Sequence, residues 1–257
     1  MLNYIKSELY RMVHSKGIYI LTASCTALLL AMNLVLHFSG KNIPSFPYAS
    51  TEFAFSMVAD SFQMVLILTL CLGTIVFADE YKNRTLMNSV AYGYSRIGLF
   101  LGKVAVGLIV SFLALAVALF VFITSAYLLL ENSGVEHLQM LLRGFVLNIP
   151  ILIAGELAAY MFLFLFGKTA TTWGWLGLIA FLPVVTGLLG MKFPVFEKID
   201  SWLIYTVAGA YSMDSEGGIT MAFMTQEGAF RCLAAGGIGI VIFLVIGIVG
   251  MAKKELK

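Results

Sequence analysis

Long runs of apolar residues dominate this sequence and restrict what it can fold into. Each run has few or no charged residues and is about as long as an α-helix must be, near 20 residues, to cross the hydrocarbon core of a bilayer. The runs are continuous, whereas the strands of a membrane β-barrel alternate apolar and polar residues over about 10 positions. We therefore predict an all-α, polytopic integral membrane protein with six transmembrane helices. These cover residues 17–38, 53–78, 104–130, 144–166, 173–190 and 232–252.

The composition supports this prediction. Hydrophobic residues make up 60% of the chain and charged residues 12%, with a mean hydropathy of +0.95, whereas a soluble domain has about 25% charged residues. A polar stretch, residues 3–16, precedes the first run, and no convincing small-residue cleavage site is present, so we predict a retained first helix and no cleavable signal peptide. Most of the 16 basic residues fall in segments that share one side of the membrane with the N-terminus, which predicts that both termini are cytoplasmic.

The chain is predicted to be a single transmembrane domain, residues 1–257, whose first segment lies on the membrane. Residues 1–16 are expected to form an amphipathic helix in the membrane interface. An ordinary basic flank that only orients the first span is the alternative. The apolar face of the predicted helix carries Leu2, Ile5, Leu9, Met12 and Val13.

Two further segments are predicted to have special roles in the fold. Residues 191–230 contain an apolar stretch, residues 202–211, that is too short to cross a bilayer, so we predict an extracellular re-entrant or surface-lying helix pair there. The last span opens with small residues, from Ala234 to Gly239. Small residues allow helix backbones to approach closely, which predicts a packing face within the chain or between two copies.

A charged segment between the second and third spans, residues 79–98, is the strongest functional signal in the sequence. Force from a soluble motor enters a membrane protein through a small element that projects from the bilayer, with apolar residues to fill a cleft in the motor and charges to orient it. Leu86 provides the first kind of residue, and Glu80, Arg84 and Arg96 provide the second. The alternative is a plain cytoplasmic loop that follows the bias of basic residues toward the inside.

The order of residues in this segment resembles that in the membrane subunits of ABC type-2 exporters. The resemblance rests on Glu80 after the second span, then Thr85-Leu86, then Ser95-Arg96, and Gly102-Lys103 entering the third span. It departs from the family pattern at Arg84, where glycine is usual. The resemblance covers the whole chain through its spans, interface helix, inner loop and outer helices. It implies a coupling helix near residues 82–96 that docks on a separate ATP-binding subunit, which would hold the ATP and Mg²⁺.

The resemblance also implies which residues and partners matter. This chain would have no catalytic residues and no cofactor of its own, and it would pair with a second copy or a homologous permease in a bacterial cell membrane. Small permeases of this family often expel antimicrobial peptides such as lantibiotics, so we expect ATP-driven export of an amphipathic or hydrophobic substrate, with such a peptide as one candidate. No nucleic-acid partner is expected. The residues implied in partner coupling are Glu80, Lys82, Arg84, Thr85, Leu86, Arg96 and Lys103.

Glu156 is the other candidate functional residue, because it lies near the middle of the fourth predicted span. A charged carboxylate at the bilayer centre costs about 2.5 to 3.5 kcal/mol on insertion scales, so it should face the bundle interior and have a partner. One interpretation is a substrate pathway that includes Glu156 and Asn148. The other is an interhelical hydrogen bond, with Asn148, Thr186 or a tyrosine as the partner.

Other motifs do not indicate chemistry within the chain. Gly167-Lys168-Thr169 resembles the end of a phosphate-binding loop, but Phe162 stands where that loop needs a glycine. The three histidines lie in separate segments without paired carboxylate or cysteine ligands, so no metal site is predicted. Two alternatives to the exporter remain: an ion-coupled secondary transporter that uses Glu156, and a non-transporting membrane scaffold or sensor subunit.

Overall fold

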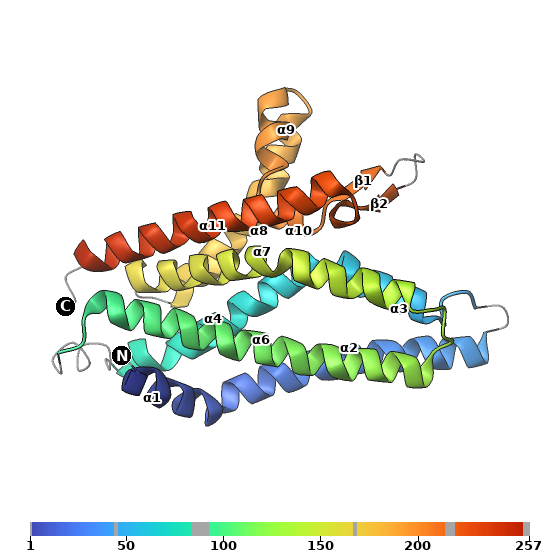
Figure 1. Ribbon diagram of the computed structural model, residues 1–257, viewed down its shortest axis with the longest axis horizontal. Helices are drawn as coiled ribbons and strands as arrows, with labels where there is room; N and C mark the ends of the chain where they lie inside the picture. The colour runs from blue at the N-terminus through green and yellow to red at the C-terminus, as the bar shows by residue number, and fades with distance from the viewer. Residues whose placement is uncertain (1, 44–45, 84–92, 167–168, 214–218, 254–257) are drawn as a thin grey trace.

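The computed structural model is a bundle of long helices that lie lengthwise beside one another (Figure 1). It describes the chain except for residues 1, 44–45, 84–92, 167–168, 214–218 and 254–257. The elements are α1 (Leu2–Val13), α2 (Lys16–Asn42), α3 (Thr51–Asp60), α4 (Phe62–Asn83), α6 (Arg96–Leu129), α7 (Glu136–Phe166), α8 (Thr169–Gly190), α9 (Pro194–Asp200), α10 (Ile204–Ala208), β1 (Tyr211–Met213), β2 (Ile219–Met221), the 3-10 helix η1 (Ala222–Met224) and α11 (Gln226–Lys253).

The all-α class is confirmed, apart from the small hairpin of β1 and β2. Within the described residues, four helices, α2, α6, α7 and α11, are long and apolar enough to cross a membrane, and a bent pair of helices raises the number to five. The described apolar part of α8, Ile179–Gly190, is shorter than a span. The predicted count of six is therefore not confirmed.

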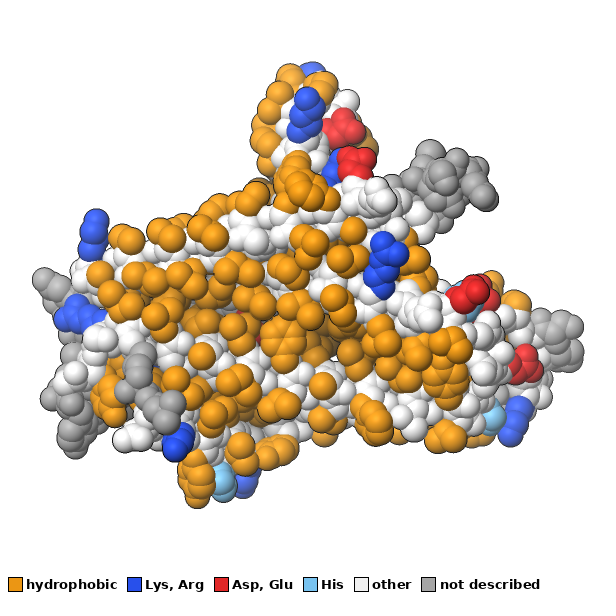
Figure 2. Space-filling model, in the orientation of Figure 1, with side chains coloured by type: hydrophobic (Ala, Val, Ile, Leu, Met, Phe, Trp, Pro, Cys, Tyr) orange, Lys and Arg blue, Asp and Glu red, His pale blue; other side chains and the backbone are white. Residues whose placement is uncertain are grey.

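The two ends of the bundle differ from its middle in the distribution of charged and hydrophobic side chains. Figure 1 places α1 and the last turn of α11 at the same end of the bundle, with the start of α6. Figure 2 shows hydrophobic side chains along the body of the face in view, while most charged side chains gather at the two ends and around α9. This distribution is the one expected for helices whose middle sections face hydrocarbon.

The second predicted span, residues 53–78, is broken at Ser61. The axes of Thr51–Asp60 and Phe62–Leu68 differ by 58°. The Ser61 hydroxyl donates a 2.8 Å hydrogen bond to the carbonyl oxygen of Met57 one turn earlier, and such back-bonding bends helices. Asp60 next to the break accepts a hydrogen bond from the Tyr211 hydroxyl of β1. Polar contacts inside the apolar run therefore accompany the bend, which we did not predict.

The small residues of the last span include one, Gly236, that packs within the chain. Gly236 lies directly against the backbone of α7, because a Cβ atom added to it would be 2.6 Å from Ile151 N and from Pro150 C. Gly237, by contrast, has nothing within 4 Å of such a Cβ atom. The absence of a side chain at Gly236 thus lets α7 and α11 approach closely.

Helices α2 and α6 are joined by polar contacts within their apolar interface. The buried Asn33 donates from Nδ2 to the carbonyl oxygen of Phe122 at 3.1 Å and to Ser125 Oγ at 2.7 Å. One turn further, Nδ1 of His37 lies 2.5 Å from the carbonyl oxygen of Leu129. These contacts fix the register of the first span against the third.

Residues 191–230 contain the two short helices α9 and α10, followed by the hairpin, η1 and the first turn of α11. Asp200 at the end of α9 accepts hydrogen bonds from Thr186 of α8, at 2.5 Å, and from Thr206 of α10, at 3.3 Å. Gln63 of α4 donates to the carbonyl oxygen of Tyr205 at 3.1 Å. A helix pair was predicted here, whereas the hairpin was not.

Candidate functional site

The predicted coupling segment, residues 79–98, begins in the last turns of α4. The backbone of Glu80 and Lys82 is helical and belongs to α4, which ends at Asn83. Nothing is described of the side chains of these two residues. Three of the other predicted coupling residues, Arg84, Thr85 and Leu86, lie outside the described residues. Their role in coupling stays a prediction.

The far end of this segment turns sharply into α6. Gly93 has a φ angle of +89°, a conformation that glycine adopts at little cost and other residues rarely adopt. Ser95 then caps α6, and its hydroxyl oxygen accepts a 3.1 Å hydrogen bond from the backbone N–H of Gly98. Such a cap satisfies one of the free N–H groups at a helix start. Arg96, a predicted coupling residue, is the first residue of α6 and is partly exposed.

Helix α1 docks on this start of α6. Its buried residues Tyr4, Glu8 and Met12 are spaced four apart and therefore lie on one face of the helix. The Tyr4 ring rests against Gly102 of α6, where an added Cβ atom would be 2.9 Å from the ring. The same ring lies 5.4 Å from the ring of Tyr94, centroid to centroid. Thus α1 contacts both α6 and the residues that lead into it.

Charged groups lie at the centre of this contact. Lys103 Nζ of α6 is 2.9 Å from Glu8 Oε2, and Arg11 is 2.8 Å from the same oxygen. The Lys103 side chain is 0% exposed and that of Glu8 is 10% exposed. Removing one partner of such a buried ion pair strongly destabilises the folded protein, because the other charge is then left unpaired in a poorly solvated site. The ion pair therefore fixes the position of α1 on α6.

This geometry changes the interpretation of Lys103. The side chain was predicted to act in partner coupling, but in this conformation it points into the protein rather than toward a docking surface. Lys103 therefore holds α1 on α6 in this conformation. Neither Tyr4 nor Glu8 was predicted to take part in this contact. The sequence holds one indication of it, because Glu8 is the only acidic residue among the basic residues of the first 16 positions.

The face of α1 that meets the protein differs from the predicted apolar face. Val13, assigned to that face, is exposed, whereas Tyr4 and Glu8, which were not assigned to it, are buried. Ile5 and Leu9 are only partly buried, against the core that includes Met12. A polar residue is buried here because it meets a matching charge from α6, which a hydrophobicity pattern does not reveal.

Glu156 lies in the interior of the bundle, as predicted, and has partners. Its Oε1 atom accepts a 2.9 Å hydrogen bond from the Ser111 hydroxyl of α6 and another of 2.9 Å from the Tyr160 hydroxyl one turn later on α7. All three side chains are at most 1% exposed. Of the three partners predicted for Glu156, only the tyrosine is found among its hydrogen bonds, as Tyr160. Ser111, the other partner, was not predicted.

A glycine provides the space for this cluster. Gly107 lies one turn before Ser111 on α6, and a Cβ atom added to it would overlap the Tyr160 hydroxyl. The hydroxyl thus occupies a notch in α6 beside the carboxylate. Glu156, Tyr160 and Ser111 form an interhelical hydrogen-bond group that joins α6 to α7.

The other two predicted partners of Glu156 bond elsewhere. Asn148 is buried on the same helix and donates from Nδ2 to the carbonyl oxygen of Gly144 at 2.9 Å. Its Oδ1 atom has no hydrogen-bond partner among the described residues. Thr186 bonds to Asp200. No hydrogen bond in the described part of the chain joins Asn148 to Glu156, which lies about 12 Å further along the helix axis at 1.5 Å per residue.

Comparison with known proteins identifies a family. The family model described as "ABC-2 family transporter protein" matches residues 4–170, from α1 to the first residues of α8. The matched region thus includes the docked helix, the charged segment, the start of α6 and the Glu156 cluster. No curated protein matches the chain.

Proposed function

Because the chain belongs to the ABC-2 transporter family of membrane permease components, we propose that it is the permease subunit of an ATP-driven exporter whose ATP hydrolysis takes place on a separate subunit. The ATP-binding subunit would dock on the segment from Glu80 to Arg96 and hold ATP and Mg²⁺. The proposed location is the bacterial plasma membrane, with both termini in the cytoplasm.

The attachment of α1 to the start of α6 is the observation that carries this proposal. Tyr4 contacts Tyr94 in the segment that leads into α6, and Glu8 pairs with Lys103 two turns inside the helix. A push on the charged segment would therefore move α1 and α6 together rather than bend a loose loop. Because α6 also carries Ser111, this movement would reach the hydrogen bonds of Glu156 on α7.

The proposed substrate is amphipathic or hydrophobic, with an antimicrobial peptide as the candidate. Acidic residues in the segments predicted to be extracellular support a cationic substrate, and the described ones include Glu131, Glu136, Glu197 and Glu227. Glu227 is paired with Arg231 at 2.6 Å, which reduces its attraction for another cation. The long helices leave little room for a pathway within one chain, so two copies, or this chain and a homologous permease, would enclose it.

The test is reconstitution of the chain with the ATP-binding subunit that copurifies with it from its native membranes. Arg96→Glu should leave the complex assembled in the membrane but lower substrate-stimulated ATP hydrolysis and transport together. Lys253→Glu provides the matched control, because it reverses an exposed basic residue at the same end of the bundle. Unchanged ATP hydrolysis and transport in Arg96→Glu would contradict the proposed coupling route.

A further inference from the structure

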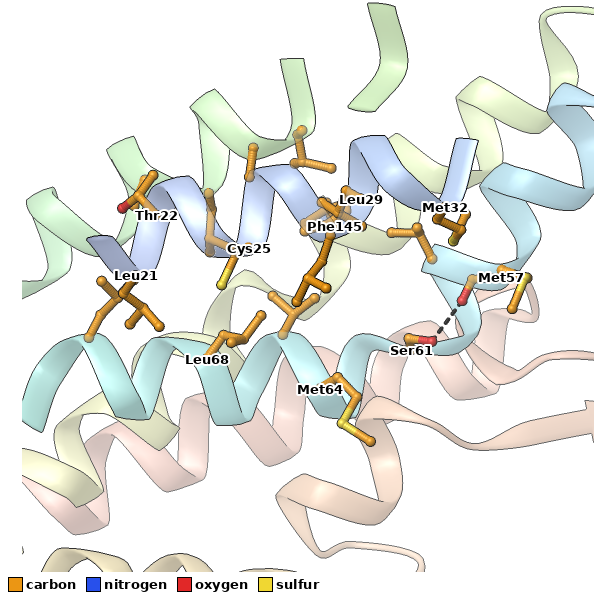
Figure 3. Close-up of a pocket in the computed structure, with 18 residues that line it drawn as sticks. Leu21, Thr22, Cys25, Leu29, Met32, Met57, Ser61, Met64, Leu68 and Phe145 are labelled. Atoms are coloured by element: carbon orange, nitrogen blue, oxygen red, sulfur yellow. Dashed lines mark hydrogen bonds between the residues drawn. The ribbon is translucent and has the colours of Figure 1, made fainter. Parts of the chain in front are cut away.

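A cavity of about 250 Å³ lies between the first two spans and is closed behind by α6 and α7. Cys25 of α2 and Leu68 of α4 face each other across it, and Met64 and Ser61 line the end near the break between α3 and α4 (Figure 3). Ala118 of α6 forms part of the wall. The cavity therefore separates α2 from α4 at this level, and α4 leads into the charged segment.

The residues that line the cavity favour a hydrocarbon ligand. Among the described residues, no charged side chain lines the cavity, and the hydroxyl and thiol groups of the lining are those of Thr22, Cys25 and Ser61. The Ser61 hydroxyl already donates to the Met57 carbonyl oxygen. A water molecule needs two to four polar partners to occupy a cavity stably, and apolar cavities stay dry. An ionic or strongly polar ligand would likewise lose its solvation here without finding partners.

The open side of the cavity is continuous with the exposed apolar surface of α2 and α4. Leu28, 72% exposed, and Met64, 61% exposed, belong both to the lining and to the outer faces of α2 and α4. Because α2 and the bent pair of α3 and α4 are apolar enough to cross a membrane, acyl chains would border that surface in a bilayer. We propose that the cavity is a binding site for one acyl chain of a membrane phospholipid, which enters laterally between α2 and α4.

The methionines of the lining suit this occupant. Met32, Met57 and Met64 come from three different helices. Their unbranched, flexible side chains adapt to irregular apolar shapes. The bound chain packs α4 against α2 at the level of the break, where protein side chains leave space. It thereby sets the position of the helix that leads to the charged segment.

Fluorescence quenching tests this site without any transport partner. Phe145 lines the cavity from α7, so Phe145→Trp places a reporter there, in a background where Trp173, Trp175 and Trp202 are replaced by Phe. The protein is reconstituted in vesicles of phosphatidylcholine with and without bromine atoms on the acyl chains. Phe164→Trp is the control for a buried residue outside the cavity, since Phe164 is 1% exposed and is not one of the residues that line the cavity.

We expect brominated lipid to quench Phe145→Trp strongly and Phe164→Trp weakly. Filling the cavity with Ala118→Leu should remove most of the Phe145→Trp quenching, whereas Val117→Leu, at an exposed neighbouring position outside the lining, should not. Equal quenching of the two tryptophan reporters would overturn the site. So would undiminished quenching in a folded Ala118→Leu variant. If Ala118→Leu does not fold, the comparison of quenching in Phe145→Trp and Phe164→Trp is sufficient to test the proposed site.

Discussion

Lys103 and Glu8 form an ion pair of 2.9 Å although 95 residues separate them in the chain. The pair joins the first helix to the start of the longest helix, α6, immediately after the charged segment. Arg11 shares the same carboxylate oxygen, so Glu8 has a second partner on its own helix. Loss of Glu8 and loss of Lys103 would thus leave different charges behind, because Glu8 would keep Arg11 as a partner if Lys103 were removed.

A double-mutant cycle at Glu8 and Lys103 should show this asymmetry. Glu8→Leu leaves the buried Lys103 without this carboxylate and should lower the free energy of unfolding by about 3 to 5 kcal/mol. Lys103→Met should cost less, because Glu8 keeps Arg11. The double variant should recover most of the loss, since hydrophobic replacement of a whole buried pair is often neutral. Unfolding in detergent micelles measures these differences.

Glu52→Gln is the control for this cycle, because the Glu52 side chain is 59% exposed and its carboxylate lies 3.8 Å from His137. Its stability should stay close to that of the unaltered protein. A double variant no more stable than Glu8→Leu would show that the two residues do not act as a pair.

Substitutions at Glu156 distinguish its structural role from proton coupling. Glu156→Gln keeps an oxygen that accepts from Ser111 and Tyr160, so a permease driven by a partner should retain most of its transport activity. Glu156→Leu leaves both hydroxyls without this acceptor and should destabilise the protein by about 1 to 3 kcal/mol for each. Transport in vesicles and unfolding in micelles are the two measurements. Complete loss of transport in a well-folded Glu156→Gln variant would favour the ion-coupled transporter instead.

Two adjacent glycines of α11 should respond differently to the same substitution. Gly236→Ala places a methyl group 2.6 Å from backbone atoms of Pro150 and Ile151, so overpacking should cost about 1 to 3 kcal/mol. Gly237→Ala meets nothing within 4 Å and should be neutral or stabilising by up to about 1 kcal/mol, because alanine favours helix. Thermal unfolding of the two variants checks the prediction. Equal stabilities would mean that α7 and α11 pack differently in the bilayer.

Asp200 should control the order of α9 and α10. Asp200→Ala removes the acceptor for Thr186 and Thr206, and hydrogen bonds to a charged group are worth about 1.5 to 3 kcal/mol. Hydrogen exchange should therefore speed up in residues 194–208 while α2 keeps its protection. Glu197→Ala, at an exposed position on the same helix, should leave exchange unchanged. Uniform loss of protection along the whole chain would indicate a global effect rather than this local one.

The fold was largely predictable because membrane spans require long apolar runs. Helices α2, α6, α7 and α11 cover the corresponding predicted spans. The break at Ser61 was not predictable in this way, since it depends on contacts with Met57 and with the distant Tyr211, through Asp60. Contacts between residues far apart in sequence leave no trace in a hydropathy pattern.

The candidate site was predictable in part for the same reason. A carboxylate in an apolar span must face the interior and find a partner, and Glu156 does so. Ser111 and Gly107, which lie on another helix, could be identified only from the packing of α6 on α7. The burial of Glu8 was hidden because an acidic residue near the N-terminus usually lies in solvent.

Site-specific photo-crosslinking from position 86 tests the central claim most directly. A photoreactive amino acid in place of Leu86 should crosslink to an ATP-binding-cassette subunit in native membranes, because the proposed docking surface includes this residue. The same probe in place of Val135, exposed at the opposite end of the bundle, should not. A transport-competent complex in which position 86 crosslinks to no ATP-binding subunit would contradict the account.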